Sequence, residues 1–402
     1  MFSFWKRARP NDKSAERVRP GQPASAGITP HPSIEPIAEQ LPVDRSSGHR
    51  DLLAGLLGSG AWCVDYLKEE DDGTIEVAGW TIAPGYEPGA LDFTLNDQPF
   101  DEVAYPLPRE DLREAMWYVP EGLASGFVCR MHRRLEEVCP NGSGVLKFID
   151  KQTGQPLREE HNYYYDARKV GPELPPPSLR ARVHGSANGR SFRLEGYTHF
   201  VKLELVLRRL FGRGYRDFGS LLDWGCGCGR FLRYFRDIDA DLAITGADVD
   251  REAVEWVATN FPFVRGVSLP LHPPSPLQPS AHDLIIGISI FTHLGEPEQF
   301  EWLEELQRVA APGAVLLMSV HGETAVSRQP WSVRQLFDWR ARGFAAGTSG
   351  DLDGVLEEAD YYKTTFHTRE YILANWSRYF DIKEIVPGYL GNLQDLVVMV
   401  RR

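Results

Sequence analysis

Residues 221–232 read LLDWGCGCGRFL, and glycine occupies every second position from Gly225 through Gly227 to Gly229. An apolar run precedes the first glycine, and a segment with helical spacing of its apolar residues follows the last one. Because glycine has no side chain, a strand that runs into such a turn and then into a helix lets the backbone approach a ligand closely. The stretch therefore predicts a ligand-binding turn between a strand and a helix.

The spacing of the glycines separates the ligand classes that such a turn serves. A dinucleotide fingerprint is G-x-G-x-x-G, whereas Arg230 follows Gly229 directly, so that pattern is not met. A phosphate-binding P-loop is excluded because no Gly-Lys-Ser/Thr follows. Cys226 and Cys228 form a C-x-C pair, but the sequence has no second His or Cys pair with the spacing of zinc ligands, so we expect no metal.

Helical and strand patterns alternate from about residue 190 to the end of the chain. This alternation predicts an α/β fold, a doubly wound Rossmann-like sheet that is mostly parallel. The last two strands are separated by a short turn with Gly388 and Gly391, which predicts an antiparallel hairpin at the sheet edge. We expect helices at 198–211, 230–238, 250–261, 297–311 and 368–380, and strands at 220–224, 242–248, 282–290, 314–320, 380–386 and 395–402.

Four features in order resemble the class I S-adenosylmethionine-dependent methyltransferases, over residues 190–402. Asp223 stands two positions before the G-x-G-x-G loop, and Asp248 ends a second strand nineteen positions after Gly229. AHDLIIGISIFTHL resembles the family's fourth-strand motif, and WLEELQRVAAPGAVLLMSVHG resembles the helix, Pro-Gly turn and fifth strand that follow it.

The resemblance implies S-adenosyl-L-methionine as the cofactor and assigns roles to residues around the loop. A carboxylate at the end of the second strand accepts both ribose hydroxyls, which suits Asp248, whereas Asp250 is expected to cap the next helix. Asp223 would engage the methionine end of the cofactor, directly or through water. The alternative is that both aspartates only cap helices. The expected cofactor-binding set is Asp223, Gly225, Cys226, Gly227, Gly229, Asp248, Val249 and Ser289. Residues 268–283 offer no clear Asp or Asn for the adenine amino group, so the adenine subsite is unassigned.

The acceptor is expected beyond the carboxyl ends of the strands, where ligands of open parallel sheets bind. Methyl transfer requires alignment of the nucleophile with the methyl carbon, and an oxygen nucleophile must also lose a proton, which histidine accepts near neutral pH. Segment 323–370 interrupts the core and is expected to form a lid over the acceptor. We expect His321, His293 and His367 as candidate catalytic residues, and Tyr362, Phe291 and Glu323 as substrate-binding residues. The alternative for each histidine is a hydrogen-bonded structural role.

The first half of the chain has a different pattern. We expect a disordered tail at 1–50, a β-rich sandwich-like accessory domain at 51–167 and a Pro-rich, extended linker at 168–189. GTIEVAGWTIAP and YPLPREDL resemble, weakly, modules fused to methyltransferases and glycosyltransferases of surface-polysaccharide assembly. Trp80 would stack on a sugar ring or, alternatively, belong to the core of this domain.

Composition limits the partners. A chain of 402 residues is expected to form two domains, and its net charge of −12 disfavours nucleic acid as a partner. No apolar run is long enough to span a membrane, no secretory signal begins the chain, and the five cysteines are few and odd in number, so we expect a cytoplasmic protein. The oligomeric state is open.

These patterns together predict a methyltransferase that moves a methyl group from S-adenosylmethionine to an oxygen of a small-molecule or glycan acceptor. One alternative is a catalytically inactive methyltransferase-fold protein that binds a glycan or a partner. A dinucleotide-dependent oxidoreductase is a third reading, against which the glycine spacing argues.

Overall fold

The computed structural model describes residues 45–402, apart from residues 59, 88, 120–122, 169–172, 239–240, 350–357 and 359–360. Most of the predicted tail lies outside the described residues. Its last four residues are helical, contrary to the prediction, because α2 spans Ser47–Leu57 and the Ser46 side chain accepts a hydrogen bond from the backbone N–H of His49. No helix in the described part of the chain is long and apolar enough to cross a membrane.

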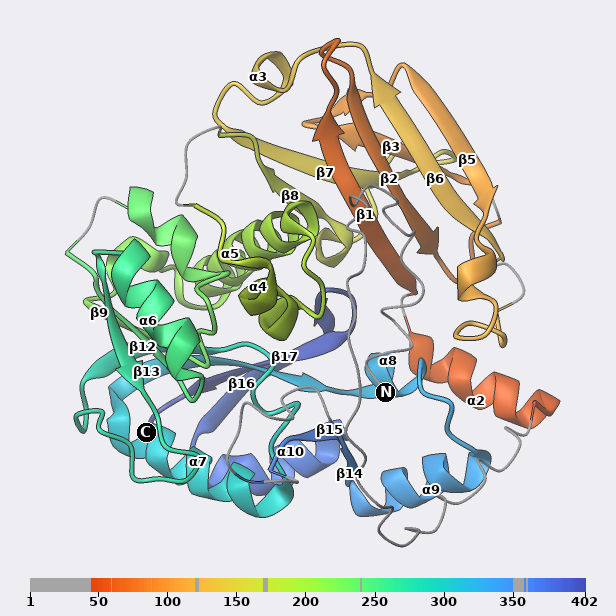
Figure 1. Cartoon of the computed structure of the whole chain (residues 1–402). Helices are drawn as coiled ribbons and strands as arrows, with labels where there is room; N and C mark the ends of the chain where they lie inside the picture. Colours follow the sequence, from red (N-terminus) through yellow and green to blue (C-terminus); the bar gives the residue numbers. More distant parts are fainter. Residues whose placement is uncertain are drawn as a thin grey trace, which may run out of the picture.

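Two antiparallel sheets form the first half of the described chain (Figure 1). Their strand orders are β1-β2-β6-β5 and β4-β3-β7-β8. Phe127 on one sheet packs against Phe93 and Phe148 on the other, with ring centroids 4.5 and 5.9 Å apart, so the core lies between the sheets as in a sandwich. The elements are β1 (Ala61–Glu69), β2 (Ile75–Ile82), β3 (Leu91–Leu95), β4 (Gln98–Pro99), β5 (Glu102–Pro108), η1 (Glu110–Leu112), β6 (Ala124–Met131), α3 (Leu135–Val138), β7 (Ser143–Asp150), η3 (Glu159–His161) and β8 (Tyr163–Asp166).

The predicted extended linker contains a helix instead, α4 (Pro177–His184). Pro177 opens it, since proline has the backbone angle of a first helical turn and needs no hydrogen-bond donor there. Gly185 ends it in the left-handed conformation, with φ of 68°. The long helix α5 (Gly189–Phe211) follows at once, and the Asn188 side chain caps it by accepting from the backbone N–H groups of its first turn.

The second half is built on a sheet of seven described strands in the order β11-β10-β9-β12-β13-β17-β16. β9 pairs in parallel with β10 and β12, whereas β17 pairs antiparallel with both β13 and β16. This confirms the predicted Rossmann-like, mostly parallel sheet with an antiparallel hairpin at its edge. The strands are β9 (Ser220–Trp224), β10 (Ala243–Asp248), β11 (Val264–Ser268), β12 (His282–Gly287), β13 (Ala310–His321), β16 (Asp381–Leu390) and β17 (Gln394–Val400).

Helices cover both faces of this sheet (Figure 1). Buried side chains of α5 and α6 join one apolar cluster, and those of α7 and α10 join another on the opposite face. The expected helix at 230–238 is a 3-10 turn, η5 (Leu232–Asp237), and that at 368–380 is α10 (Arg369–Asn375) continued by η6 (Trp376–Arg378). The other helices are η4 (Tyr215–Asp217), α6 (Arg251–Asn260) and α7 (Glu296–Val309).

The segment expected to be a lid packs against both halves of the chain. It forms α8 (Glu323–Val326), α9 (Val333–Arg342) and the two-stranded sheet of β14 (Phe344–Thr348) and β15 (Lys363–His367). Trp331 and Trp339 lie in one apolar cluster with α2 and Trp80. Trp80 is 1% exposed, so it is a core residue, and stacking of its ring on a sugar is ruled out in this structure.

Candidate functional site

The glycine loop follows β9 at the point where the strand order reverses between β9 and β12. Gly225, Gly227 and Gly229 have φ of 79°, 51° and 76°, a region that residues with a side chain rarely adopt. A Cβ on Gly225 would collide with Ile290, and one on Gly227 would lie 2.5 Å from a Val183 methyl carbon. The turn therefore requires glycine for both its backbone angles and its close contacts.

Asp248 ends β10, the neighbour of β9, and its carboxylate lies over the glycine loop. One oxygen accepts the backbone N–H of Gly227 at 2.7 Å, and the other accepts that of Asp250 at 2.9 Å. Each oxygen keeps a further lone pair, so the group can still accept two hydroxyl donors. Burial raises the pKa of Asp248 to about 6. Asp250 caps α6 by accepting from Ala253, as predicted.

Asp223 lies at the end of β9 and is 3% exposed. Its Oδ2 atom has no hydrogen-bond partner among the described residues. Burial, together with the nearby charge of Asp248, raises the pKa of Asp223 to about 8. Because an unpaired buried carboxyl costs free energy, on the order of 1–3 kcal/mol, its position fits a cationic ligand group such as an α-amino group.

One large cavity connects these residues. Its volume is about 1170 Å³, whereas pockets for a single small ligand usually measure about 300–1,000 Å³. The cavity therefore has room for a cofactor and an acceptor together. Of the predicted cofactor-binding residues, those that line it are Asp223, Gly225, Cys226, Gly227, Asp248, Val249 and Ser289.

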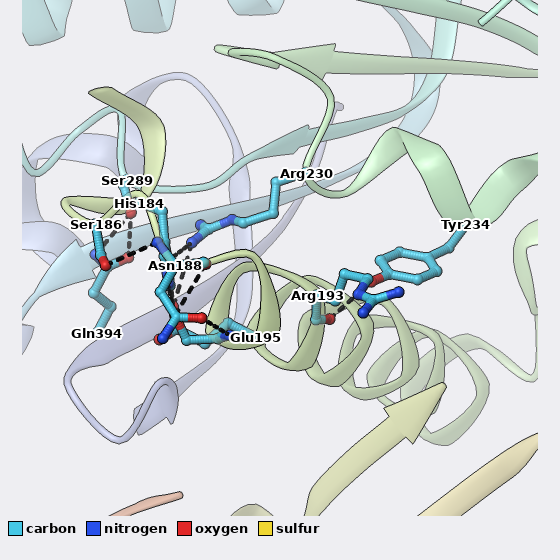
Figure 2. Close-up of polar contacts among 10 residues, drawn as sticks. His184, Ser186, Asn188, Arg193, Glu195, Arg230, Tyr234, Ser289 and Gln394 are labelled. Atoms are coloured by element: carbon cyan, nitrogen blue, oxygen red, sulfur yellow. Dashed lines mark hydrogen bonds and ion pairs between the residues drawn. The ribbon is translucent and has the colours of Figure 1, made fainter. Parts of the chain in front are cut away.

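Gly229 is the predicted cofactor residue that the structure places outside this lining. A Cβ at its position would collide with the Phe261 ring, so the third glycine serves the packing of the loop on the core. Ser289 follows β12 with an unusual φ of 64°. Its backbone N–H donates to Ser319 Oγ at 2.7 Å, and its hydroxyl contacts the amide of Gln394 on β17 (Figure 2). The strained serine is thus fixed by the neighbouring strands.

Two of the predicted catalytic histidines line the cavity, together with Tyr362. His293 stacks on the Tyr362 ring with centroids 4.1 Å apart, and its Nδ1 lies 2.9 Å from the Lys363 carbonyl oxygen. The Nδ1 atom of His321 lies 3.2 Å from the Thr365 carbonyl oxygen. Since a carbonyl only accepts, Nδ1 carries a proton in both rings, and Nε2 of a neutral ring then carries the lone pair. Burial lowers the pKa of His321 to about 3, so its ring is neutral.

The third predicted catalytic histidine is structural. His367 is 1% exposed, and the described lining of the cavity does not include it. Its Nε2 contacts Gln299 Oε1 at 2.8 Å, and the Gln299 amide donates to the carbonyl oxygens of Phe291 and Leu294. His367 therefore fixes the loop after β12 through Gln299, and the structure places it away from the described cavity lining that holds His293 and His321.

Two predicted substrate-binding residues also lie outside the described lining. Phe291 is fully buried, with ring centroids 5.1 Å from Trp224 and 4.6 Å from Trp376, so it belongs to the core. Glu323 begins α8 and is exposed. Both follow strands as predicted, but their side chains turn to the core and to solvent, which residue order alone does not reveal.

Sequence reasoning missed the wall of the cavity that α4, α5 and the turn between them provide. Val183 of α4 packs over Gly227, and Arg182 pairs with Asp250 at 2.7 Å. Arg230, directly after the glycine loop, contacts Glu195 of α5 at 3.3 Å and His184 of α4 at 3.2 Å (Figure 2). The Pro177 start and Gly185 end of α4 were the signals that could have revealed it.

The first half of the chain also reaches the cavity, through Cys63 of β1 and Tyr163 of β8. Asn392, in the turn between β16 and β17, holds this wall. Its Oδ1 accepts from the backbone N–H of Trp62 at 2.7 Å and from the Arg328 guanidinium at 2.6 Å. The β-rich half is therefore joined to the cavity wall by hydrogen bonds.

Residues 222–316 match the family model described as "Methyltransferase domain". Solved structures with a similar arrangement include a putative S-adenosylmethionine dependent methyltransferase from Listeria monocytogenes, at 13% identity, covering 50% of this chain and 99% of that one, with a TM-score of 0.36. Another is the Burkholderia thailandensis 1,6-didemethyltoxoflavin-N1-methyltransferase with bound 1,6-didemethyltoxoflavin and S-adenosylhomocysteine, at 14% identity, covering 61% and 99%, with a TM-score of 0.35.

The match assigns a methyltransferase domain to residues 222–316, and the mostly parallel sheet around them is consistent with the class I S-adenosylmethionine-dependent methyltransferase fold. The cofactor of this class is S-adenosylmethionine. Oδ2 of Asp223, which has no partner among the described residues, fits the amino group of this cofactor. The glycine loop fits contacts between the cofactor and the main chain, and the acceptor oxygens of Asp248 fit the ribose hydroxyls.

Proposed function

We propose that this protein transfers the methyl group of S-adenosylmethionine to a hydroxyl oxygen of a small-molecule or glycan acceptor. The observation that carries the proposal is the buried carboxyl of Asp223, whose Oδ2 atom has no hydrogen-bond partner among the described residues. It lies with Asp248 beside a glycine loop, on the wall of a cavity of about 1170 Å³. Such a wall would suit a cationic nucleoside ligand, and the volume would leave space for a second molecule.

The cofactor side of the cavity is assigned to residues that bind and orient. Asp223 would ionise against the amino group, Asp248 would accept the ribose hydroxyls, and Val249 and Ser289 would bound the nucleoside. S-adenosylmethionine supplies a methyl group on a positively charged sulfur. Placing that group against an oxygen nucleophile accounts for most of the rate enhancement in a displacement of this kind.

The acceptor side is assigned to His321 and His293, with Tyr362 as a packing surface. Both rings line the cavity, lie 6.4 Å apart between centroids and carry their lone pair on Nε2. The reacting hydroxyl becomes more acidic as its oxygen bonds to the methyl carbon, so even a weakly basic imidazole can then take its proton. We propose His321 as the base because its ring is fixed from two strands. His321 is the last residue of β13, and its Nδ1 contacts the Thr365 carbonyl oxygen of β15.

We further propose that residues 51–167 and 190–402 are two domains whose junction carries the acceptor, with α4 of the intervening segment over the cofactor. We place the protein in the cytoplasm, because its five cysteines form no disulfide. With a net charge of −12, we propose that nucleic acid is not the acceptor.

The test uses methyl-labelled S-adenosylmethionine and the full chain, with a panel of hydroxylated small molecules and glycans. The expected result is label in one acceptor, formation of S-adenosylhomocysteine, and loss of both in His321→Asn. Cofactor binding without transfer over the whole panel would instead favour an inactive binding module. Absence of cofactor binding would remove the proposal altogether.

A further inference from the structure

His199 lines the cavity from α5 and is 6% exposed. Both of its ring nitrogens lack a hydrogen-bond partner, and among the described buried side chains it is alone in having two such atoms. The mechanism above does not use it. A buried imidazole with two unpaired nitrogens is costly, so its position in the cavity points to a ligand that completes its hydrogen bonds.

The ring is in its neutral form. Burial, together with the neighbouring charges of Arg230, Lys202 and His184 and against the opposite effect of Glu195, lowers the pKa of His199 to about 3. A neutral imidazole presents one N–H donor and one lone pair. That N–H has no acceptor among the described residues.

The surroundings of His199 carry an excess of positive charge. Lys202, one turn along α5, is buried, and its Nζ donates to the carbonyl oxygens of Glu160 at 2.6 Å and Tyr389 at 3.2 Å, while burial lowers its pKa to about 7. Arg230 and the buried Arg328 line the same cavity. Glu195 faces His199 and contacts Arg230 at 3.3 Å, whereas Glu159 and Glu160 face Lys202, and Asp223 interacts with Arg230.

The walls of this part of the cavity come from both halves of the chain. Cys63 and Tyr163 belong to the β-rich half, whereas His199 and Arg328 belong to the second half. Cys63, Glu195 and Arg328 are electrostatic neighbours of Tyr163, and Glu195 is also a neighbour of His199. We name this part of the lining, made of Cys63, Tyr163, Glu195, His199 and Arg328, the junction arm. It is continuous with the Asp223 end of the same cavity.

We propose that the junction arm binds an anionic group of the methyl acceptor, a carboxylate or a phosphate, and that the His199 N–H donates to it. This inference rests on the proposed function, since the acceptor is the molecule that carries the anion. His199 is then a specificity-determining residue that selects hydroxylated acids or phosphate esters over neutral sugars.

Three hexose probes test the proposal with the full-length protein: glucose, glucose 6-phosphate and glucuronate. The imidazole Cε1–H signal of His199 is followed by NMR, and its assignment is made by its loss in His199→Asn. We expect glucose 6-phosphate or glucuronate to shift this signal and to raise the pKa of His199, and glucose to do neither. The probe that acts tells phosphate from carboxylate. Probe affinity, measured by calorimetry, should fall at least tenfold in His199→Asn.

His282→Asn is the matched control. His282 begins β12, is also buried with an unpartnered ring nitrogen, and the described cavity lining does not include it. Its substitution should leave the affinity for the probes unchanged. The proposal is overturned if no anionic probe shifts the His199 signal, if glucose acts equally, or if His199→Asn binds the anion as the wild type does. S-adenosylhomocysteine binding, measured separately, reports on the proposed function and is expected to survive in His199→Asn.

Discussion

Asp223 and Asp248 end neighbouring parallel strands and face one cavity, in a register that places Asp223 opposite Gly246, two residues before Asp248. The two carboxyl groups have different environments. Asp248 accepts two backbone N–H groups, whereas Oδ2 of Asp223 has no partner among the described residues. The negative charge of Asp248 helps to keep the pKa of Asp223 at about 8. A cationic ligand between the two carboxyl groups would instead lower the pKa of Asp223.

Cofactor binding is therefore expected to release a proton. The free protein holds Asp223 largely protonated below pH 8, and an amino group of the ligand favours its ionised form. Affinity for S-adenosylhomocysteine should rise between pH 6 and 8. Calorimetry in two buffers with different ionisation enthalpies measures the proton release, which should vanish in Asp223→Asn. A proton uptake on binding would contradict the assignment of Asp223.

Gly225→Ala should abolish cofactor binding and lower stability by about 1–3 kcal/mol, because φ of 79° and the contact with Ile290 both exclude a Cβ. Gly347→Ala is the control, since a Cβ at that position meets nothing within 4 Å. Thermal unfolding with and without S-adenosylhomocysteine measures both effects. Equal behaviour of the two variants would show that the loop tolerates a side chain.

His321→Asn should reduce turnover by about 10²–10⁴-fold while leaving the affinity for S-adenosylhomocysteine unchanged. His367→Asn should act in the opposite way. Its contact with Gln299 is lost, so stability falls, but turnover of the folded fraction persists. Steady-state kinetics and thermal unfolding of both variants separate the two roles. If folded His367→Asn lost turnover while His321→Asn stayed active, the catalytic and structural roles of the two histidines would be reversed.

Asp395, at the second position of β17, gives a pH dependence of stability. It is 8% exposed, and burial raises its pKa to about 7 even though it accepts the Gly388 N–H at 2.8 Å. Since the folded-state pKa exceeds the unfolded value, this contribution is complete below pH 3.8 and is lost as the pH rises through 7. Between about pH 4 and 7 the stability of the wild type should fall relative to Asp395→Asn by about 1.4 kcal/mol per pH unit. Urea unfolding of both proteins at several pH values measures this difference in the free energy of unfolding. If the two free energies changed with pH in parallel, the raised pKa of Asp395 would be refuted.

The sheet and the cofactor loop could be predicted because their signals are local. Buried parallel strands read as apolar runs, positive φ requires glycine, and Asp250 precedes its helix at the N-cap position. The edge hairpin likewise followed from two apolar runs around a glycine turn.

The rest depends on contacts between residues far apart in the chain. The turn at Asn392 reaches the β-rich half at Trp62, and α4 packs over Gly227 although its prolines suggested an extended linker. His199 lies in a helix whose amphipathic pattern did not distinguish a cavity-lining histidine from a core residue. His367 is the last residue of β15, at a strand end where a catalytic residue could lie, but the side chain of the buried Gln299 contacts its ring.

The central claim is that the Gly225–Gly229 loop and Asp248 form one cofactor site, and calorimetric titration with S-adenosylhomocysteine tests it most directly. Asp283→Ala is the matched control, because Asp283 accepts the backbone N–H groups of Gly219 and Ser220 at the other end of β9. The account predicts saturable binding at one site per chain, weakened at least tenfold in Asp248→Ala and unchanged in Asp283→Ala. No saturable binding to the wild type, or equal binding to all three proteins, would contradict it.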